Sequence, residues 1–311
     1  MHPSRATLPT SWARIVAHRV ALIGIALVLG SGVALAEGQA SADATDKMQY
    51  TLFNPTPEDA MRGMDTDRPN KTNTAHTIDA GHVQIETGFF DWVHYRNRYQ
   101  AGDVTTDTVN LGHFNVRLGV LNNLEVNAAF DSYDFYWNKD YAAGQSMRQN
   151  GFGDTTLGGK LNLWGGEGSD ETWATAMALQ PQFKIGTAKP QLGNGHTELF
   201  VGAPFMVNLP ADFHLAVQTT VSWERNRANT GEVTGWQNSA SLDRVLVGKL
   251  DAYVEYWSHW STERHQQPTQ TVDVGFTYPL TDNLVVDMGA NFGLNKASNT
   301  VEWLAGMSLR F

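Results

Sequence analysis

The sequence predicts an all-β protein: an antiparallel transmembrane β-barrel of about twelve strands, preceded by a signal peptide and an irregular N-terminal periplasmic segment. Three observations predict this fold. Apolar and polar residues alternate along most of the chain after residue 82, short and long connections follow one another in turn, and no run of about 18 apolar residues follows the N-terminal region. Because successive side chains of a strand point to opposite faces, each stretch offers one face to lipid and one to a polar lumen.

The composition is compatible with such a barrel and excludes other classes. The 311 residues include no Cys, so neither disulfides nor thiolate metal sites can form. The 29 Gly and 11% aromatic residues suit β-structure better than helix. The mean hydropathy of -0.33 is no objection, because apolar residues in a barrel alternate with polar ones. The net charge of -10 argues against nucleic-acid binding, which requires clustered positive charge.

Residues 1–36 have the features of a cleaved signal peptide. A leader with three arginines and no acidic residue precedes the apolar core Val20–Leu29, and Ala34–Ala36 is a cleavage site of the small-x-small type. A membrane anchor is the alternative, but the apolar core is short and is interrupted at residues 30–32. We therefore expect cleavage after Ala36 and export to the outer membrane of a Gram-negative bacterium.

Residues 37–81 form the predicted N-terminal periplasmic segment. They show no sustained periodicity and include the charged motif Asp65, Asp67, Arg68 and Pro69. Pro69 disfavours helix at Arg68, which suits a chain that turns sharply. We expect the segment to enter the mouth of the barrel as a partial plug, with Arg68 paired to a wall carboxylate such as Glu125. The alternative is a mobile tether whose charges are solvated.

Residues 82–311 supply the predicted barrel. Strands are expected at 82–89, 114–120, 124–131, 154–163, 173–185, 199–209, 213–224, 236–246, 250–256, 271–280, 284–292 and 301–311. Apart from the eighth, which is the least regular and whose register stays open, each has apolar residues spaced two apart on one face. In chain order these are Val83, Ile85 and Phe89; Phe114, Val116 and Leu118; Leu124, Val126 and Phe130; Leu157, Leu161 and Leu163; Trp173, Met177, Leu179 and Phe183; Leu199, Val201 and Phe205; Phe213, Leu215, Val217 and Trp223; Leu250, Val254 and Tyr256; Val272, Val274 and Phe276; Leu284, Val286 and Met288; and Val301, Trp303, Met307 and Leu309.

The last strand, Val301–Phe311, is the most informative. Its length matches the roughly 9–11 residues that a tilted strand needs to cross a bilayer. It ends on Phe311, an aromatic residue on the apolar face, as the closing strands of outer-membrane barrels commonly do. We therefore predict that Phe311 is an assembly signal for the barrel-assembly machinery.

The connections favour a membrane barrel over a soluble β-sandwich. Residues 121–123, 210–212 and 281–283 are short, whereas 96–105, 138–150, 186–195 and 226–235 are longer and polar. Bacterial barrels have short periplasmic turns and longer outer loops. Trp173 and Phe213 fall near short turns, and Trp223 and Trp303 near long loops, as expected for aromatic residues at the two membrane interfaces.

The alternation also assigns charged side chains to the lumen face of the predicted strands. The predicted lumen-lining charges are Glu86, Arg117, Glu125, Asp131, Asp154, Lys160, Lys184, Glu198, Glu224, Asp251, Glu255, Asp273, Asp287, Glu302 and Arg310. Ion pairing across the wall would account for them without any role in transport. Because acids outnumber bases, we expect a negative lumen that favours cations over anions.

The sequence offers no catalytic, cofactor or metal site. No nucleophile-elbow, zincin or phosphate-loop motif occurs. His214 and Ser222 share a predicted face but lie about 26 Å apart along one strand, too far for a Ser–His pair. Gly151–Asp154 has too few oxygen ligands for a Ca²⁺ loop and suits a turn into a strand.

Four stretches together resemble a known family: T-D-R-P at 66–69, A-G-H-V-Q-I-E-T-G at 80–88, R-L-G-V-L-N-N-L-E-V at 117–126 and G-F-G-D-T-T-L-G-G-K at 151–160. From residue 65 onward the chain is similar to the bacterial outer-membrane family named for the MetA pathway of phenol degradation, whose members are often called transporters. The resemblance implies an outer-membrane barrel and uptake of aromatic compounds.

We accordingly predict an outer-membrane barrel that passes, or helps to pass, small solutes, including aromatic or hydrophobic compounds. The alternative is a non-conducting structural or ligand-binding barrel. The expected partners are outer-membrane lipid, lipopolysaccharide, the barrel-assembly machinery and an unidentified small solute, with no nucleic acid.

Overall fold

The computed structural model describes residues 47–99 and 102–311, so the predicted signal peptide, 1–36, lies outside the described residues. Two short 3-10 helices, η1 (Lys47–Gln49) and η2 (Glu58–Ala60), precede the strands. No helix in the described ranges is long and apolar enough to cross a membrane.

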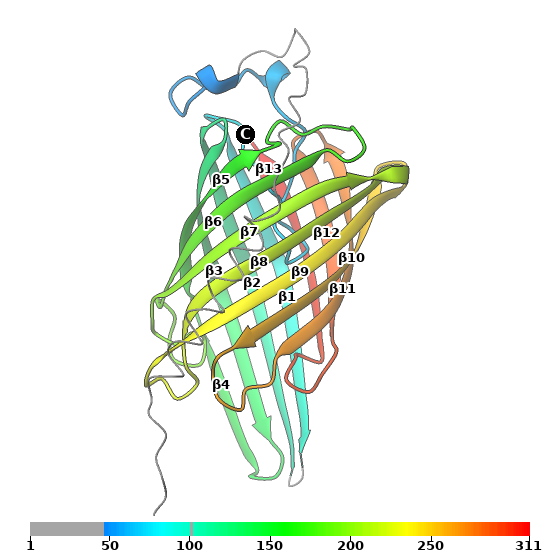
Figure 1. The fold of residues 1–311 in the computed structure, drawn as a ribbon. Helices are drawn as coiled ribbons and strands as arrows, with labels where there is room; N and C mark the ends of the chain where they lie inside the picture. The colour runs from blue at the N-terminus through cyan, green and yellow to red at the C-terminus, as the bar shows by residue number, and fades with distance from the viewer. Residues whose placement is uncertain (1–46, 100–101) are drawn as a thin grey trace, which may run out of the picture. The chain divides into compact units, whose positions relative to one another are not determined.

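From Val83 onward the described chain forms a single closed antiparallel sheet (Figure 1). Its strands are β1 (Val83–Tyr99), β2 (Gly102–Leu121), β3 (Leu124–Asp140), β4 (Gln145–Gly151), β5 (Thr155–Trp164), β6 (Thr175–Ile185), β7 (Glu198–Leu209), β8 (Phe213–Arg225), β9 (Glu232–Val247), β10 (Leu250–Ser261), β11 (Thr269–Thr281), β12 (Leu284–Gly293) and β13 (Val301–Arg310), with η3 (Pro210–Asp212) between β7 and β8. The pairing of β2 with β3 closes the ring. β4 and β5 occupy one position beside β3, so the barrel has twelve strand positions, as predicted.

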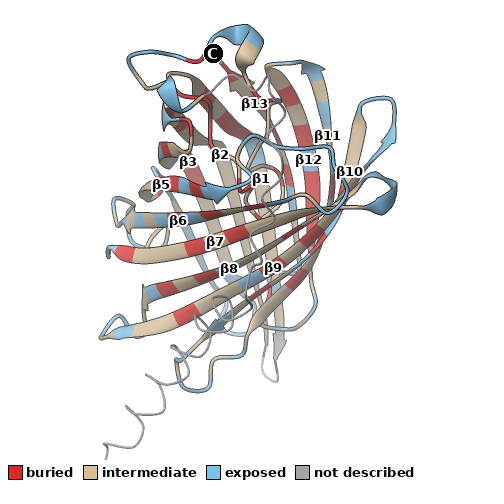
Figure 2. Cartoon of the chain, turned by 45° about the horizontal axis from the view of Figure 1, so that its top comes forward, coloured by how far each residue is buried: buried red, intermediate tan, exposed pale blue. Residues whose placement is uncertain are grey.

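Burial is inverted relative to a soluble protein. Along β11, Val274, Phe276 and Leu280 are 39%, 43% and 53% exposed, whereas Thr271 and Asp273 are 7% and 0% exposed. Buried residues recur on strand after strand around the barrel (Figure 2). The apolar face of each strand therefore points outward to lipid and the polar face inward.

Two predicted loops are wrong, because they are strands. The stretches 96–105 and 138–150 belong largely to β1 to β4, which continue past the end of the ring that lies opposite the chain's C-terminus (Figure 1). We call this end distal and the other end terminal. Outside the membrane both faces of a strand meet water, so these strands lack the apolar face that marks the others.

The other connections follow the predicted asymmetry with one exception. Residues 122–123, 210–212, 248–249 and 282–283 make tight turns at the terminal end, and 186–197, 226–231, 262–268 and 294–300 make longer distal loops. The exception is the terminal connection 165–174, which includes Trp173, a residue predicted to be in a strand. Trp173 has a φ of 72° and is 64% exposed, so it belongs to the loop before β6.

Phe311 joins the end of the last strand to the start of the first through hydrogen bonds. Its backbone N–H donates to Val83 (2.8 Å), its carbonyl accepts from the Val83 N–H (3.2 Å), and Nδ1 of His82 lies 2.9 Å from the same carbonyl. Deleting Phe311 should therefore lower the yield of folded barrel several-fold, whereas Phe311→Tyr should not. The readout is the fraction of outer-membrane protein that migrates faster on gels before boiling than after it. A deletion variant that assembles like the parent would show that Phe311 is dispensable.

Candidate functional site: the polar interior and its inner segment

Residues 62–80, here called the inner segment, lie inside the barrel and follow its wall. From Asp67 to Ile78 the contacts pass in one direction around the ring, from strand to strand. In order, the contacts are Asp67 N–H with Glu86 of β1, Arg68 with Asp287 of β12, Lys71 with Asp273 of β11, Thr72 with Glu255 of β10 and Ser239 of β9, Asn73 with Gln218 of β8 and Gln180 of β6, Ala75 with Met206 of β7 and Asn162 of β5, and Ile78 with Glu125 of β3. Only a segment enclosed by the barrel can reach all of these strands.

The most buried charges gather around Arg117 of β2. Its guanidinium donates two hydrogen bonds to Glu125 (2.9 Å each) and one to Glu86 (2.9 Å), and lies 3.6 Å from Asp67. Lys160 of β5 donates to Asp67 at 2.8 Å. These side chains are at most 8% exposed. Each charge is therefore matched by close partners, which a buried ion requires.

Arg68 enters the barrel and pairs with a wall carboxylate, but this carboxylate is Asp287 and not Glu125, the example that was predicted. It forms a bidentate pair with Asp287 of β12, with Nε and Nη2 at 3.2 and 2.9 Å from the two carboxylate oxygens. Glu125 is occupied by Arg117, because Glu125 lies opposite Gly119 and Arg117 is its diagonal neighbour on β2. Gly306 of β13 allows the approach of Arg68, since a Cβ there would lie 2.5 Å from Nη2.

Wall carboxylates also accept backbone N–H groups of the inner segment. Glu255 accepts from the N–H groups of Lys71 (2.8 Å) and Thr72 (2.7 Å), and Glu125 accepts from Ile78 (2.9 Å). A chain without regular secondary structure would otherwise leave these donors unsatisfied in a buried place. The acidic wall residues therefore hold the inner segment's backbone as well as its cations.

A second group of charges fixes the two ends of the inner segment at the terminal rim. Arg62 donates to Asp79 through Nε (3.0 Å) and its backbone N–H (3.1 Å), and Nη1 of Arg310 lies 3.7 Å from Asp79. The Asp79 carbonyl lies against Gly119, where a Cβ would come within 2.1 Å of it. The segment thus enters and leaves the barrel through one polar junction.

The remaining predicted lumen charges lie outside the contacts of the inner segment. Lys184 bridges Glu198 (2.7 Å) and Asp154 (3.4 Å). The others meet polar neighbours: Asp131 meets His113 (2.7 Å), Glu224 meets His259 (3.0 Å), Glu302 meets Asn291 (2.9 Å), and Asp251 lines the cavity described below.

Sequence alternation missed several charged residues of the interior, among them Lys71, Asp79, Asp91 and Asp134. Lys71 and Asp79 belong to the irregular segment, where no periodicity assigns a face. Asp91 follows a bulge between Gly88 and Phe90 of β1, past which the inward-facing positions of that strand change. Asp134 of β3 shares the face of Asp91, because both lie in one row with Asn110 of β2. Asp134 is buried and accepts a hydrogen bond from Asn110 at 3.0 Å. The phenylalanine pair Phe89–Phe90 was the one available sign of the bulge.

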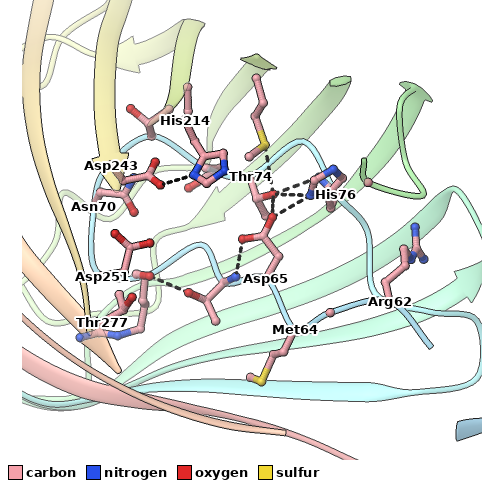
Figure 3. Close-up of a pocket in the computed structure, with 18 of the residues that line it drawn as sticks. Arg62, Met64, Asp65, Asn70, Thr74, His76, His214, Asp243, Asp251 and Thr277 are labelled. Carbon is pink, nitrogen blue, oxygen red and sulfur yellow. Dashed lines mark hydrogen bonds and ion pairs between the residues drawn. The ribbon is translucent and has the colours of Figure 1, made fainter. Parts of the chain in front are cut away.

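A cavity of about 580 Å³ lies between the inner segment and β8 to β11 at the terminal end (Figure 3). His214 pairs with Asp243 (3.0 Å), and His76 with Asp65 (2.7 Å). Burial alone would raise the pKa of Asp65, but the hydrogen bond and charge of His76 and the hydroxyl of Thr74 outweigh it and hold this pKa well below its usual value. The Asp65 carboxylate therefore stays ionised in the folded protein at every pH above its unfolded pKa of about 4. Its contribution to the stability of the fold is complete in that range, and it is lost as the pH falls further toward the lowered pKa of the folded state.

Ser222, Glu224 and His259 lie together, but not in the arrangement of a catalytic triad. Glu224 accepts hydrogen bonds from both Ser222 (2.5 Å) and His259 (3.0 Å), so the carboxylate separates the hydroxyl from the imidazole that would have to activate it. Within residues 47–99 and 102–311, no group of three or more His, Cys, Asp and Glu side chains is placed to hold a metal ion.

Comparisons with known proteins agree with this architecture. The family model described as "Putative MetA-pathway of phenol degradation" matches residues 66–311. An outer membrane channel from Pseudomonas putida F1 superposes with a TM-score of 0.54 at 12% identity, over 74% of this chain and 94% of the other. The transport unit of the autotransporter AIDA-I from Escherichia coli superposes with a TM-score of 0.50 at 10% identity, over 79% and 92%. At these identities the likeness concerns the fold. Comparison with curated proteins gives no match.

Proposed function

The chain belongs to the family described as "Putative MetA-pathway of phenol degradation", and from this premise we propose that it passes small solutes across the outer membrane of a Gram-negative bacterium. In this proposal the terminal end faces the periplasm, and the inner segment sets the width of the passage. The role is non-enzymatic. The family description suggests phenolic compounds as the solutes. The test is to measure the uptake of phenolic compounds by cells with and without the protein.

The observation that carries this proposal is the polar attachment of the inner segment. The contacts with the wall described above are hydrogen bonds and ion pairs. The segment's buried apolar residues are few and small, chiefly Ala75, Ile78 and Ala80, and its apolar contact with the wall is the small cluster of Ala75 with Ala176 and Ala178. Displacement of the segment would expose polar surface that water can solvate, so no large hydrophobic free energy opposes it. A barrel with only a structural role would gain more from a packed apolar filling.

A second candidate function is retention of a ligand without conduction. The cavity of about 580 Å³ favours it, because this volume falls within the roughly 300–1,000 Å³ typical of small-molecule sites. Single-channel recording in planar bilayers separates the two functions. Discrete current steps support passage, and silent barrels that are correctly inserted support retention.

Charge selectivity gives a prediction for the passage itself. Distal to the inner segment, the wall carries the carboxylates of Asp131, Asp154, Glu198, Glu224 and Glu302, and Lys184 pairs with two of them, so acids are in surplus. Any current should therefore be carried mainly by cations. The reversal potential in a KCl gradient measures this, and Glu302→Gln with Asp131→Asn should reduce the preference. A parent barrel that prefers anions would contradict the assignment of these acids to the conducting path.

A further inference from the structure

A row of side chains marks the distal membrane boundary on the outer face of the barrel. Residues directly opposite one another in neighbouring strands share a face. Trp303 of β13 is 46% exposed and lies opposite Trp92 of β1, which lies opposite Val109 of β2, which lies opposite Phe135 of β3. Phe135 therefore points outward with the two tryptophans, and the row has the composition of an aromatic girdle.

Beyond this row the outer face of the distal extension carries charged side chains. Asp107 of β2 lies opposite Trp137 and is paired with His94 at 2.8 Å, and two cations follow on β3 and β4. The Trp137 ring stacks on Phe135, with centroids 5.6 Å apart and planes 5° apart, and Tyr133 meets Phe135 edge-on at 5.0 Å. Arg148 of β4 lies directly opposite Trp137 and so shares its face. Lys139 follows two residues further along β3, with Nζ 4.4 Å from the centroid of the Tyr141 ring.

Lys139 and Arg148 differ from the cations of the interior in having no anionic partner. The interior cations Arg62, Arg68, Lys71, Arg117, Lys160, Lys184 and Arg310 each lie within ion-pair distance of a carboxylate. Both outer cations are exposed, and within the described chain neither forms an ion pair. In a protein of net charge -10, this small outer patch is a place where an anion would be attracted.

The height of the patch matches the lipid headgroup layer. Arg148 and Trp137 lie two residues beyond the girdle row, which is about 7 Å along a strand and less along the membrane normal, because barrel strands are tilted. The polar layer on each side of a bilayer is roughly 5–7 Å thick. An anion at this height in the outer leaflet belongs to a lipid headgroup.

We propose that Arg148 and Lys139 bind a phosphate of the lipid A headgroup of lipopolysaccharide, with its acyl chains against Tyr133 and Phe135. The planar guanidinium of Arg148 suits bidentate contact with phosphate, and Lys139 adds a second point charge. The aromatic column beneath supplies the apolar surface that an acyl chain requires. The site depends on the location of the barrel in the outer membrane and not on whether the barrel conducts.

The experiment uses a double variant that carries both Lys139→Ala and Arg148→Ala, and it compares this variant with the parent and with a matched control. The control, Arg244→Ala with Lys249→Ala, removes the same two residue types at the terminal end, where Arg244 lies over the Phe213 ring at 5.0 Å. Purified lipid A is titrated into detergent-solubilised protein, and bound lipid is counted by native mass spectrometry. We expect the Lys139/Arg148 variant to bind lipid A at least five-fold more weakly than the parent, and the control to bind like the parent.

Three further arms identify the ligand. Removing the phosphates from lipid A should weaken its binding to the parent as much as the double substitution weakens the binding of intact lipid A. If the parent binds both forms of lipid A equally well, the proposal is overturned. Phosphatidylglycerol should show little difference between parent and variant. An equal loss for that lipid, or displacement of lipid A by millimolar inorganic phosphate, would show that any anion suffices and would overturn the assignment to lipid A. Lys139→Gln with Arg148→Gln, which keeps the side-chain stems, guards against loss of folding in the alanine variant.

Discussion

Deletion of residues 37–80 should raise the single-barrel conductance in planar bilayers several-fold. It removes the inner segment, whose contacts run from β12 to β3 around the wall. The strand ring should still close, because the Phe311–Val83 seam is intact and the buried wall charges become accessible to water. Arg68→Ala should give a smaller increase, since it removes only the pair with Asp287.

A reversible cross-link provides the control for this deletion. The hydroxyl oxygens of Thr72 and Ser239 are 2.7 Å apart, and the natural sequence has no Cys that could compete with two introduced at these positions. Thr72→Cys with Ser239→Cys should therefore join the inner segment to β9 on oxidation, with low conductance that rises on reduction. If the deletion variant and the oxidised cross-linked variant both conduct like the parent, the inner segment does not restrict the passage.

Arg117→Met should destabilise the folded barrel by about 3–5 kcal/mol, the usual cost of removing one partner from a buried charge network. Without the guanidinium, Glu86, Glu125 and Asp67 remain buried near one another with Lys160 as their nearest cation. The measurement is the free energy of unfolding from lipid vesicles in guanidinium chloride, with Arg148→Met, an exposed arginine, as the control.

Replacing the acids as well should recover part of this loss. Glu86→Gln and Glu125→Gln in the Arg117→Met background remove the uncompensated charges while keeping side-chain volume, and neutral replacements of whole buried networks are often tolerated. An Arg117→Met barrel as stable as the Arg148→Met control would mean that water already solvates this cluster.

The sequence predicted the membrane-crossing parts of the strands better than the distal parts that extend beyond the membrane. Within a strand that crosses the membrane, lipid outside and polar lumen inside impose a period of two, and all twelve predicted strands are confirmed. The distal parts of β1 to β4 were predicted as loops, because no solvent difference imposes that period outside the membrane. The bulge after Gly88 likewise changes the inward face without a change in composition, which concealed Asp91.

The interior shows why residue types were easier to predict than partners. Alternation can mark Asp287 as polar and inward-facing, but its partner Arg68 is 219 residues away in the sequence. Which cation reaches which carboxylate depends on the strand order of the closed ring and on how far each residue lies along its strand. Neither quantity is contained in a local pattern, so the prediction that Arg68 would meet Glu125 was wrong.

The circuit of the inner segment around the wall has a consequence for the order of assembly. Asp67 to Ile78 come early in the chain, yet their partners extend to Asp287 of β12. Contacts of such long sequence separation carry a large loop-closure cost and cannot form until late strands are in place. The part of the barrel domain that leaves the cytoplasm first is therefore the part that reaches its final place last, after the wall that surrounds it has been built.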